Sequence, residues 1–205
     1  MRSHPLSALF ILCGPVAAAA QSAQPTPITT TVSYGTLNQN DLAIRVRNED
    51  VEIRFVPLDP KVTRLLANDA FQSLRSLVET RRRSIDSVAS KAGVTEPGLA
   101  LVSFFGLRSE TRFDPQTLTV RLRNRALQPL GIIPINARFT SQQLDQREQA
   151  SAIYLFEEDL PVDDSFSLSY GALVSEDWQT KQSLIDRERA RVSARTRAGR
   201  PDTTR

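Results

Sequence analysis

The sequence predicts a mainly β protein, a β-sandwich with a helical insertion after its first hairpin and a C-terminal helix. About seven short segments between positions 28 and 172 alternate apolar and polar residues, as strands with one buried face do. A helical periodicity interrupts them at about 59–93, and another begins near Asp177. Many short strands separated by turns favour two packed sheets.

The first two strands are predicted to form a hairpin with one buried face. Apolar and polar residues alternate over 42–47 (LAIRVR) and 51–56 (VEIRFV), on either side of a short polar turn. The alternation here and in the later strands predicts eight side chains that point into the core. They are Ile44, Ile53, Phe55, Val120, Leu122, Tyr154, Phe156 and Leu168.

Two helices are expected after the hairpin. Asp59 is a suitable N-cap and Pro60 suits the first helical position, so one helix begins here. A second begins near Asn68, repeats its apolar residues at steps of three and four, and ends at Gly93. Residues 81–83 (RRR) lie mainly on its polar face. We interpret them as a solvated face, and an anion-binding patch is the alternative.

The remaining predicted strands are short. Residues 99–106 (LALVSFFG) form an apolar run of the length of a buried strand, and residues 118–122 alternate again. Pro134 places the next apolar segment at a sheet edge or a bulge. Residues 140–149 fit a short helix or a loop. Two further strands follow, 152–156 and 166–170.

The order of segments from residue 113 to residue 171 resembles the immunoglobulin-like domains found on many secreted bacterial proteins. A strand (TVRLRN) leads to a proline-interrupted connection and a polar stretch that carries Leu144. A strand (AIYLF), a hydrophilic gap and a last strand (FSLSY) then follow. The resemblance implies an immunoglobulin-like β-sandwich. Domains of this class usually bind partners or act as spacers and do not usually catalyse reactions. A fold of this kind does not itself fix a function.

The N-terminal residues are typical of an export signal. Arg2 supplies a positive n-region, an apolar segment runs from Leu6 to Cys13, and small residues occupy 18–20. The apolar segment is too short to cross a bilayer, and Leu12 argues against a lipid on the cysteine that follows it. We therefore expect a signal peptide over 1–20, a disordered spacer over 21–31, one β-sandwich-like domain over 32–186, and a basic, partly helical or disordered tail over 187–205.

Cleavage after Ala20 would remove the chain's single cysteine, histidine and methionine, which are Cys13, His4 and Met1. A mature chain without them excludes a Ser-His-Asp triad, a cysteine nucleophile, zinc or haem held by histidine or cysteine, and disulfides. Ser–Lys catalysis would need a lysine buried beside a serine, which the sequence does not favour. The lysines are Lys61, Lys91 and Lys181. We assign no catalytic, cofactor-binding or metal-binding residue.

One stretch, EEDLPVDD, concentrates acidic side chains between two predicted strands. They are Glu157, Glu158, Asp159, Asp163 and Asp164. A calcium site would need six to eight oxygen ligands, and such a loop usually contains a glycine, which is absent here. A pair of glycosidase acids would need a cleft with aromatic platforms, and most aromatic residues sit at core positions instead. We favour a solvated connection whose charges prevent edge pairing between sheets.

The basic charge of the chain is concentrated after the predicted domain. From Arg187 onward the sequence has seven arginines and two acidic residues, and the final helix is expected to fray after Val192, where it has little to bury. Any anion contact is expected at Arg187, Arg189, Arg191, Arg195, Arg197 and Arg200.

These observations favour an exported, non-catalytic envelope protein that acts as a binding or structural module. The expected partner is an unknown protein or an anionic envelope component, and the export signal argues against nucleic acid. The alternative function is that of a carboxylate-dependent enzyme acting on cell-envelope glycans.

Overall fold

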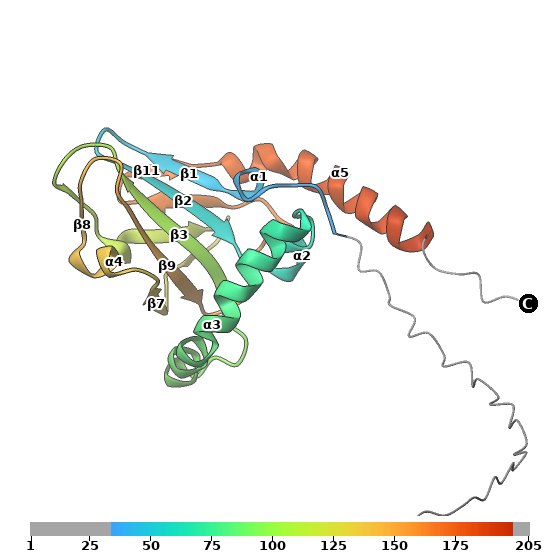
Figure 1. The fold of residues 1–205 in the computed structure, drawn as a ribbon, viewed down its shortest axis with the longest axis horizontal. Helices are drawn as coiled ribbons and strands as arrows, with labels where there is room; N and C mark the ends of the chain where they lie inside the picture. Colours follow the sequence, from blue (N-terminus) through green and yellow to red (C-terminus); the bar gives the residue numbers. More distant parts are fainter. Residues whose placement is uncertain (1–33, 199–205) are drawn as a thin grey trace, which may run out of the picture. The chain divides into compact units, whose positions relative to one another are not determined.

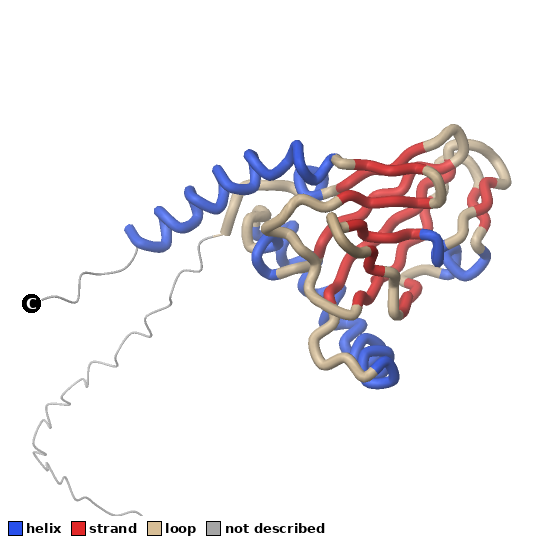
Figure 2. The backbone as a smooth tube through the Cα atoms, turned by 180° about the vertical axis from the view of Figure 1, so that it is seen from behind, coloured by secondary structure: helices blue, strands red, loops and turns tan. Residues whose placement is uncertain are grey.

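The computed structural model describes residues 34–198, which are mainly β and form three antiparallel sheets (Figures 1 and 2). The five-stranded sheet has the order β1 (Ile44–Arg47), β2 (Val51–Pro57), β3 (Gly98–Gly106), β9 (Gln149–Phe156) and β7 (Gly131–Pro134). The four-stranded sheet has the order β11 (Leu173–Ser175), β10 (Ser167–Tyr170), β5 (Leu118–Arg121) and β6 (Ala126–Leu127). The third sheet pairs β4 (Thr111–Arg112) with β8 (Gln143–Leu144).

The helices lie mostly at the margins of these sheets (Figure 2). They are α1 (Gln39–Leu42), α2 (Pro60–Thr63), α3 (Asn68–Ala92), α4 (Ala137–Ser141) and α5 (Asp177–Ala198), with a 3-10 turn over Pro115–Thr117. Local sequence signals set their ends. The Asp59 carboxylate accepts the backbone N–H of Lys61 at 2.7 Å and caps α2. Gly93, with φ 71°, ends α3 in the left-handed region, where the absence of a Cβ removes the strain.

One hydrophobic core joins the side chains of the two larger sheets. The rings of Phe104 on β3 and Tyr170 on β10 lie 6.0 Å apart. The buried Tyr154 hydroxyl donates to the Pro115 carbonyl at 2.9 Å, and its burial raises its pKa. Seven of the eight side chains predicted to point inward are fully buried, and Leu122 is only half-buried because β5 ends one residue earlier.

The structure differs from the predicted elements in three places. Residues 111–112 form a short strand, β4, that the sequence does not predict and that pairs with β8. The segment over 173–175 forms a strand, β11, that its short sequence does not predict. The last helix does not fray after Val192 but continues to Ala198. Alanine and arginine are strong helix formers, which explains why α5 persists without burial.

Pro134 lies at the end of the edge strand β7, as the sequence predicts, where its missing N–H breaks no ladder. Within the described residues, no helix combines the length and the apolar character needed to cross a bilayer.

Candidate anion-binding surface

The first turns of α5 are fixed to the sheets. The Asp177 carboxylate accepts the backbone N–H of Arg45 on β1 at 3.2 Å. Trp178 is fully buried, with its ring 5.1 Å from that of Phe166, and Ile185 is buried two turns later. Beyond Glu188 no described residue of α5 is buried, so the last turns of the helix extend away from the sheets (Figure 1).

A buried carboxylate marks the point where α5 leaves the core. The Glu188 side chain is 1% exposed. It accepts hydrogen bonds from the backbone N–H of Thr36 at 2.9 Å and from the Thr36 hydroxyl at 3.1 Å. Arg191 and Arg195 each donate to it at 3.2 Å. One acidic side chain thus ties residue 36 to two arginines of α5.

The hydrogen bonds keep Glu188 charged. Burial raises the pKa of this carboxyl, but the donors from Thr36 and Arg191 outweigh burial, so its pKa lies below the ordinary value. An ionised carboxylate orients arginine guanidinium groups more strongly than a neutral acceptor does. Glu188 therefore holds two of the predicted anion-contact residues in place while much of each remains exposed.

The other arginines of the predicted anion-contact set have different surroundings. Arg189 contacts Asp163 at 2.8 Å and Asp186 at 2.9 Å, so its charge is balanced internally. Arg187 donates to the Ser183 carbonyl at 3.1 Å and stays exposed. Arg197 is also exposed and makes no ion pair with another described residue, and Arg200 lies outside the described residues.

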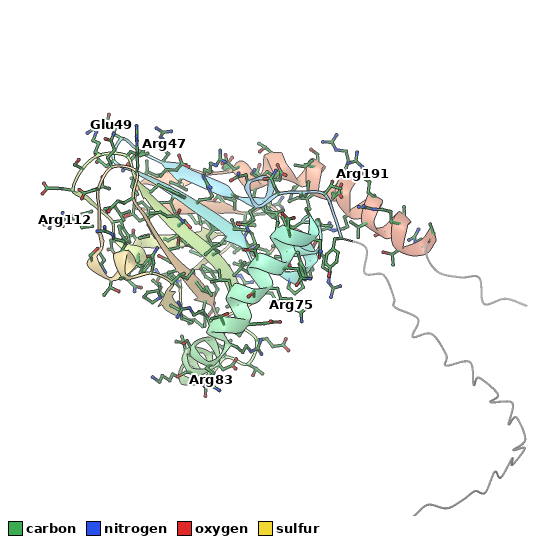
Figure 3. The ribbon with its side chains drawn as sticks, in the orientation of Figure 1. Arg47, Glu49, Arg75, Arg83, Arg112 and Arg191 are labelled. Carbon is green, nitrogen blue, oxygen red and sulfur yellow. The ribbon has the colours of Figure 1, made fainter. Side chains whose placement is uncertain are left out.

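The result is a basic surface on the projecting part of α5. Between residues 187 and 198 the helix carries five arginines and one acidic residue, and that acidic residue is buried. Figure 3 shows Arg191 extending from this part of the helix into the surroundings.

The acidic stretch at 157–164 connects the two larger sheets and is not a hairpin turn. It follows β9 of the five-stranded sheet and precedes β10 of the four-stranded sheet. Leu160 and Val162 are buried and anchor the connection in the core. Asp163 contacts Lys61 at 3.3 Å and also contacts Arg189, so the connection is held to α2 and α5.

Other acidic side chains of the stretch are also balanced or separated. Glu158 forms an ion pair with Arg125. A hollow of about 570 Å³ lies beside the stretch, lined by Asp163, Asp164 and the basic residues Arg123 and Arg125. In the part of the chain that the structure describes, no three acidic side chains gather closely enough to hold a metal ion. The stretch is a connection between the two larger sheets, and two of its five acidic side chains, Glu158 and Asp163, form ion pairs.

Lys91, Lys181 and residues 81–83 of α3 either donate to backbone carbonyls or are exposed. The ammonium group of Lys181 donates to the Asn40 carbonyl at 3.2 Å, and burial lowers its pKa. Lys91 is exposed at the end of α3. Of the residues 81–83, Arg81 donates to the Ile135 carbonyl at 3.1 Å, and the other two are exposed.

Sequence reasoning identified the arginines of α5 but missed Glu188, which organises them. A signal was present, because Glu188 precedes Arg191 by three residues and Arg195 by seven, and these spacings share one helix face. The contact with Thr36 spans 152 positions and has no local signal.

Comparisons with known protein families, with curated proteins and with solved structures gave no match for this chain.

Proposed function

We propose that the protein is an exported, non-catalytic binding module of the cell envelope, and that it holds an anionic polymer on the arginines of α5. The observation that carries the proposal is the helix over 187–198, in which four arginines are exposed while the one carboxylate is buried; the four are Arg187, Arg191, Arg195 and Arg197. Long-range attraction between such a surface and a polyanion increases the association rate and the affinity at low salt. Export rests on residues 1–20, which lie outside the described residues.

The composition of α5 favours a polymer over a lipid bilayer. A helix that lies in a membrane interface needs an apolar face rich in large side chains. After Val192 the apolar residues of the described helix are Ala194 and Ala198, which are small and exposed. The surface can therefore bind charge without having an apolar face to insert.

The alternative, a carboxylate-dependent enzyme acting on envelope glycans, has less support. A general acid or nucleophile must be available to the substrate. Asp163 and Glu158 are instead engaged with Lys61, Arg189 and Arg125. These ion pairs are better explained by their structural role in joining the sheets.

The proposal also includes the immunoglobulin-like arrangement predicted for residues 113–171. In its support, this segment contributes strands to both larger sheets, β5, β6 and β10 to one and β7 and β9 to the other. Domains of that kind present binding surfaces on a rigid β framework, which agrees with a binding module.

The test measures the binding of fluorescently labelled poly-L-glutamate by anisotropy at low ionic strength. The test variant carries Arg187→Gln and Arg197→Gln, two exposed arginines without carboxylate partners among the described residues. We expect it to bind about tenfold more weakly or worse, since each surface cation contributes roughly 1 kcal/mol at an anionic surface. The control carries Arg82→Gln and Arg83→Gln on the exposed face of α3, where Arg82 pairs with Asp86 at 3.1 Å, and it should bind within about twofold of the wild type.

Two results would contradict the proposal. Loss of binding in the α3 control, with full binding in the α5 variant, would move the anion surface to residues 81–83. Binding of phosphatidylglycerol vesicles without binding of poly-L-glutamate would make α5 a membrane-surface element. A circular dichroism spectrum of each variant checks that the helices remain folded.

A further inference from the structure

A groove of about 290 Å³ lies on the face of the five-stranded sheet that is turned away from the four-stranded sheet. Strands β2, β3 and β9 form its floor, and α3 and the residue after β7 form part of its wall. Its lining mixes two kinds of side chain. The polar ones include Arg54, Ser103, Gln149 and Ser151, and the apolar ones include Leu77 and Leu101.

The polar side chains form one row across three strands. Arg54 of β2 is the direct cross-strand partner of Ser103 of β3, and Ser103 is the direct partner of Ser151 of β9. Side chains paired in this way point to the same face and lie close together. The row therefore places a guanidinium group next to two hydroxyl groups on the groove floor.

The serine pair has one hydrogen-bond donor to spare. The two hydroxyl oxygens lie 2.8 Å apart, so one hydroxyl donates to the other. The Gln149 amide nitrogen also donates to both, at 3.2 Å to Ser103 and 2.8 Å to Ser151. Two hydroxyl groups carry two hydrogens and only one lies between them, so the other can be donated to a ligand.

The Arg54 guanidinium is only partly engaged by the protein. Its side chain is 31% exposed, and its nearest carboxylate contact is a long one, 3.6 Å to Glu52. Its central carbon lies 4.8 Å from the centre of the ring of Phe105, which also lines the groove. It makes no hydrogen bond to another described residue, and its Nε is buried without a partner. Its terminal N–H groups, whose contact with Glu52 is this long one, are suited to a carboxylate.

We propose that this groove binds a small carboxylic acid that carries a compact apolar chain. The carboxylate accepts hydrogen bonds from the Arg54 guanidinium and from the free hydroxyl hydrogen of the Ser103–Ser151 pair. The apolar chain lies against Leu77 and Leu101. The volume is at the small end of the range for ligand pockets, which sets the size of the ligand at a few carbon atoms beyond the carboxylate. The site uses no residue of α5, so it is independent of the polymer-binding proposal.

The test follows the amide resonances of isotopically labelled protein by NMR, because site-resolved shifts separate this groove from the arginines of α5. The probes are hexanoate, its neutral counterpart hexanamide, and acetate, which lacks the apolar chain. Hexanoate should shift the resonances of Ser103 and Ser151 in a saturable way. Hexanamide and acetate should each bind about tenfold more weakly, since one lacks the charge and the other the apolar contact.

Variants identify the groups that bind. Arg54→Gln should weaken hexanoate binding about tenfold, and the matched control Arg112→Gln, an exposed arginine on β4, should change it by less than about twofold. Leu101→Phe fills the groove and should abolish the saturable shifts. If Arg54→Gln does not fold, Ser151→Ala tests the same contact and should weaken binding about threefold or more.

The proposal is overturned if hexanoate produces no saturable shifts at Ser103 and Ser151. It is equally overturned if hexanamide binds as tightly as hexanoate, because the guanidinium would then have no role. Unchanged binding in Arg54→Gln, or in Ser151→Ala where the first variant is unfolded, would place the carboxylate elsewhere.

Discussion

The Glu188 carboxylate connects residue 36 to the arginines of α5, and its hydrogen bonds make it the most constrained charged side chain of the helix. Replacing it with glutamine keeps its size but removes its charge. Because charge-assisted hydrogen bonds contribute about 1.5–3 kcal/mol each and the amide retains part of the bonding, we expect Glu188→Gln to lower the free energy of unfolding at pH 7 by about 1–3 kcal/mol. Urea denaturation of the wild type and the variant measures this loss of unfolding free energy.

The same variant has a defined pH dependence. The pKa of Glu188 is lowered in the folded state, so its contribution is complete above the unfolded value near 4.5 and declines as the pH falls through the lower folded value. Wild type and Glu188→Gln should therefore converge in stability in acid. The control Glu157→Gln, at an exposed position, should match the wild type at both pH values. A stability difference that is equal at neutral and acid pH would contradict the role of the charge.

Two aromatic side chains test the assignment of the strand faces. The rings of Phe55 and Phe156 are fully buried and 6.2 Å apart. Truncating either to alanine removes this contact and leaves a cavity, which should cost about 3–5 kcal/mol of unfolding free energy. The control Val174→Ala, at a site 52% exposed, should cost less than about 0.5 kcal/mol. Losses below about 1 kcal/mol at both aromatic positions would mean that the faces are assigned wrongly.

Because helix α5 continues to Ala198, part of the C-terminal tail is expected to contribute to stability. If the helix frayed after Val192, as the sequence predicts, deleting 193–205 would leave the stability unchanged, but Arg195 donates to the buried Glu188. We now expect this deletion to cost about 0.5–1.5 kcal/mol, whereas deleting 196–205 keeps Arg195 and should cost almost nothing. Chemical denaturation of the two truncated proteins compares them. In a Glu188→Gln background the two truncations should differ less, because the coupled partner is gone.

Elements defined by local signals were predictable from the sequence, and those defined by distant partners were not. The hairpin of β1 and β2 follows from alternation, and the ends of α2 and α3 follow from Asp59 and Gly93. The connection at 157–164 also has a clear composition, but whether it closes a hairpin or crosses between sheets depends on how β9 and β10 pair. In the candidate site, the arginines are visible in the sequence, while the contact between Thr36 and Glu188 depends on tertiary structure alone.

At the scale of the whole chain, positive charge is segregated from the rest of the sequence. Residues 21–186 contain slightly more acidic than basic side chains, and the excess of arginine follows them. If residues 1–20 direct export, the mature protein should begin at Gln21, which N-terminal sequencing of protein recovered from the cell envelope can determine. Recovery of the full-length chain from the cytoplasm, or a lipid on Cys13, would contradict this expectation.

The central claim, that the α5 arginines bind a polyanion through charge, is tested most directly by the salt dependence of poly-L-glutamate binding. Each arginine that contacts the polymer displaces about one condensed counterion, so the logarithm of the binding constant should fall linearly with the logarithm of the salt concentration. The Arg187→Gln, Arg197→Gln protein should show a slope smaller by about two. The Arg82→Gln, Arg83→Gln control should keep the slope of the wild type. A slope that is the same in all three proteins would show that the polymer binds elsewhere and would contradict the account.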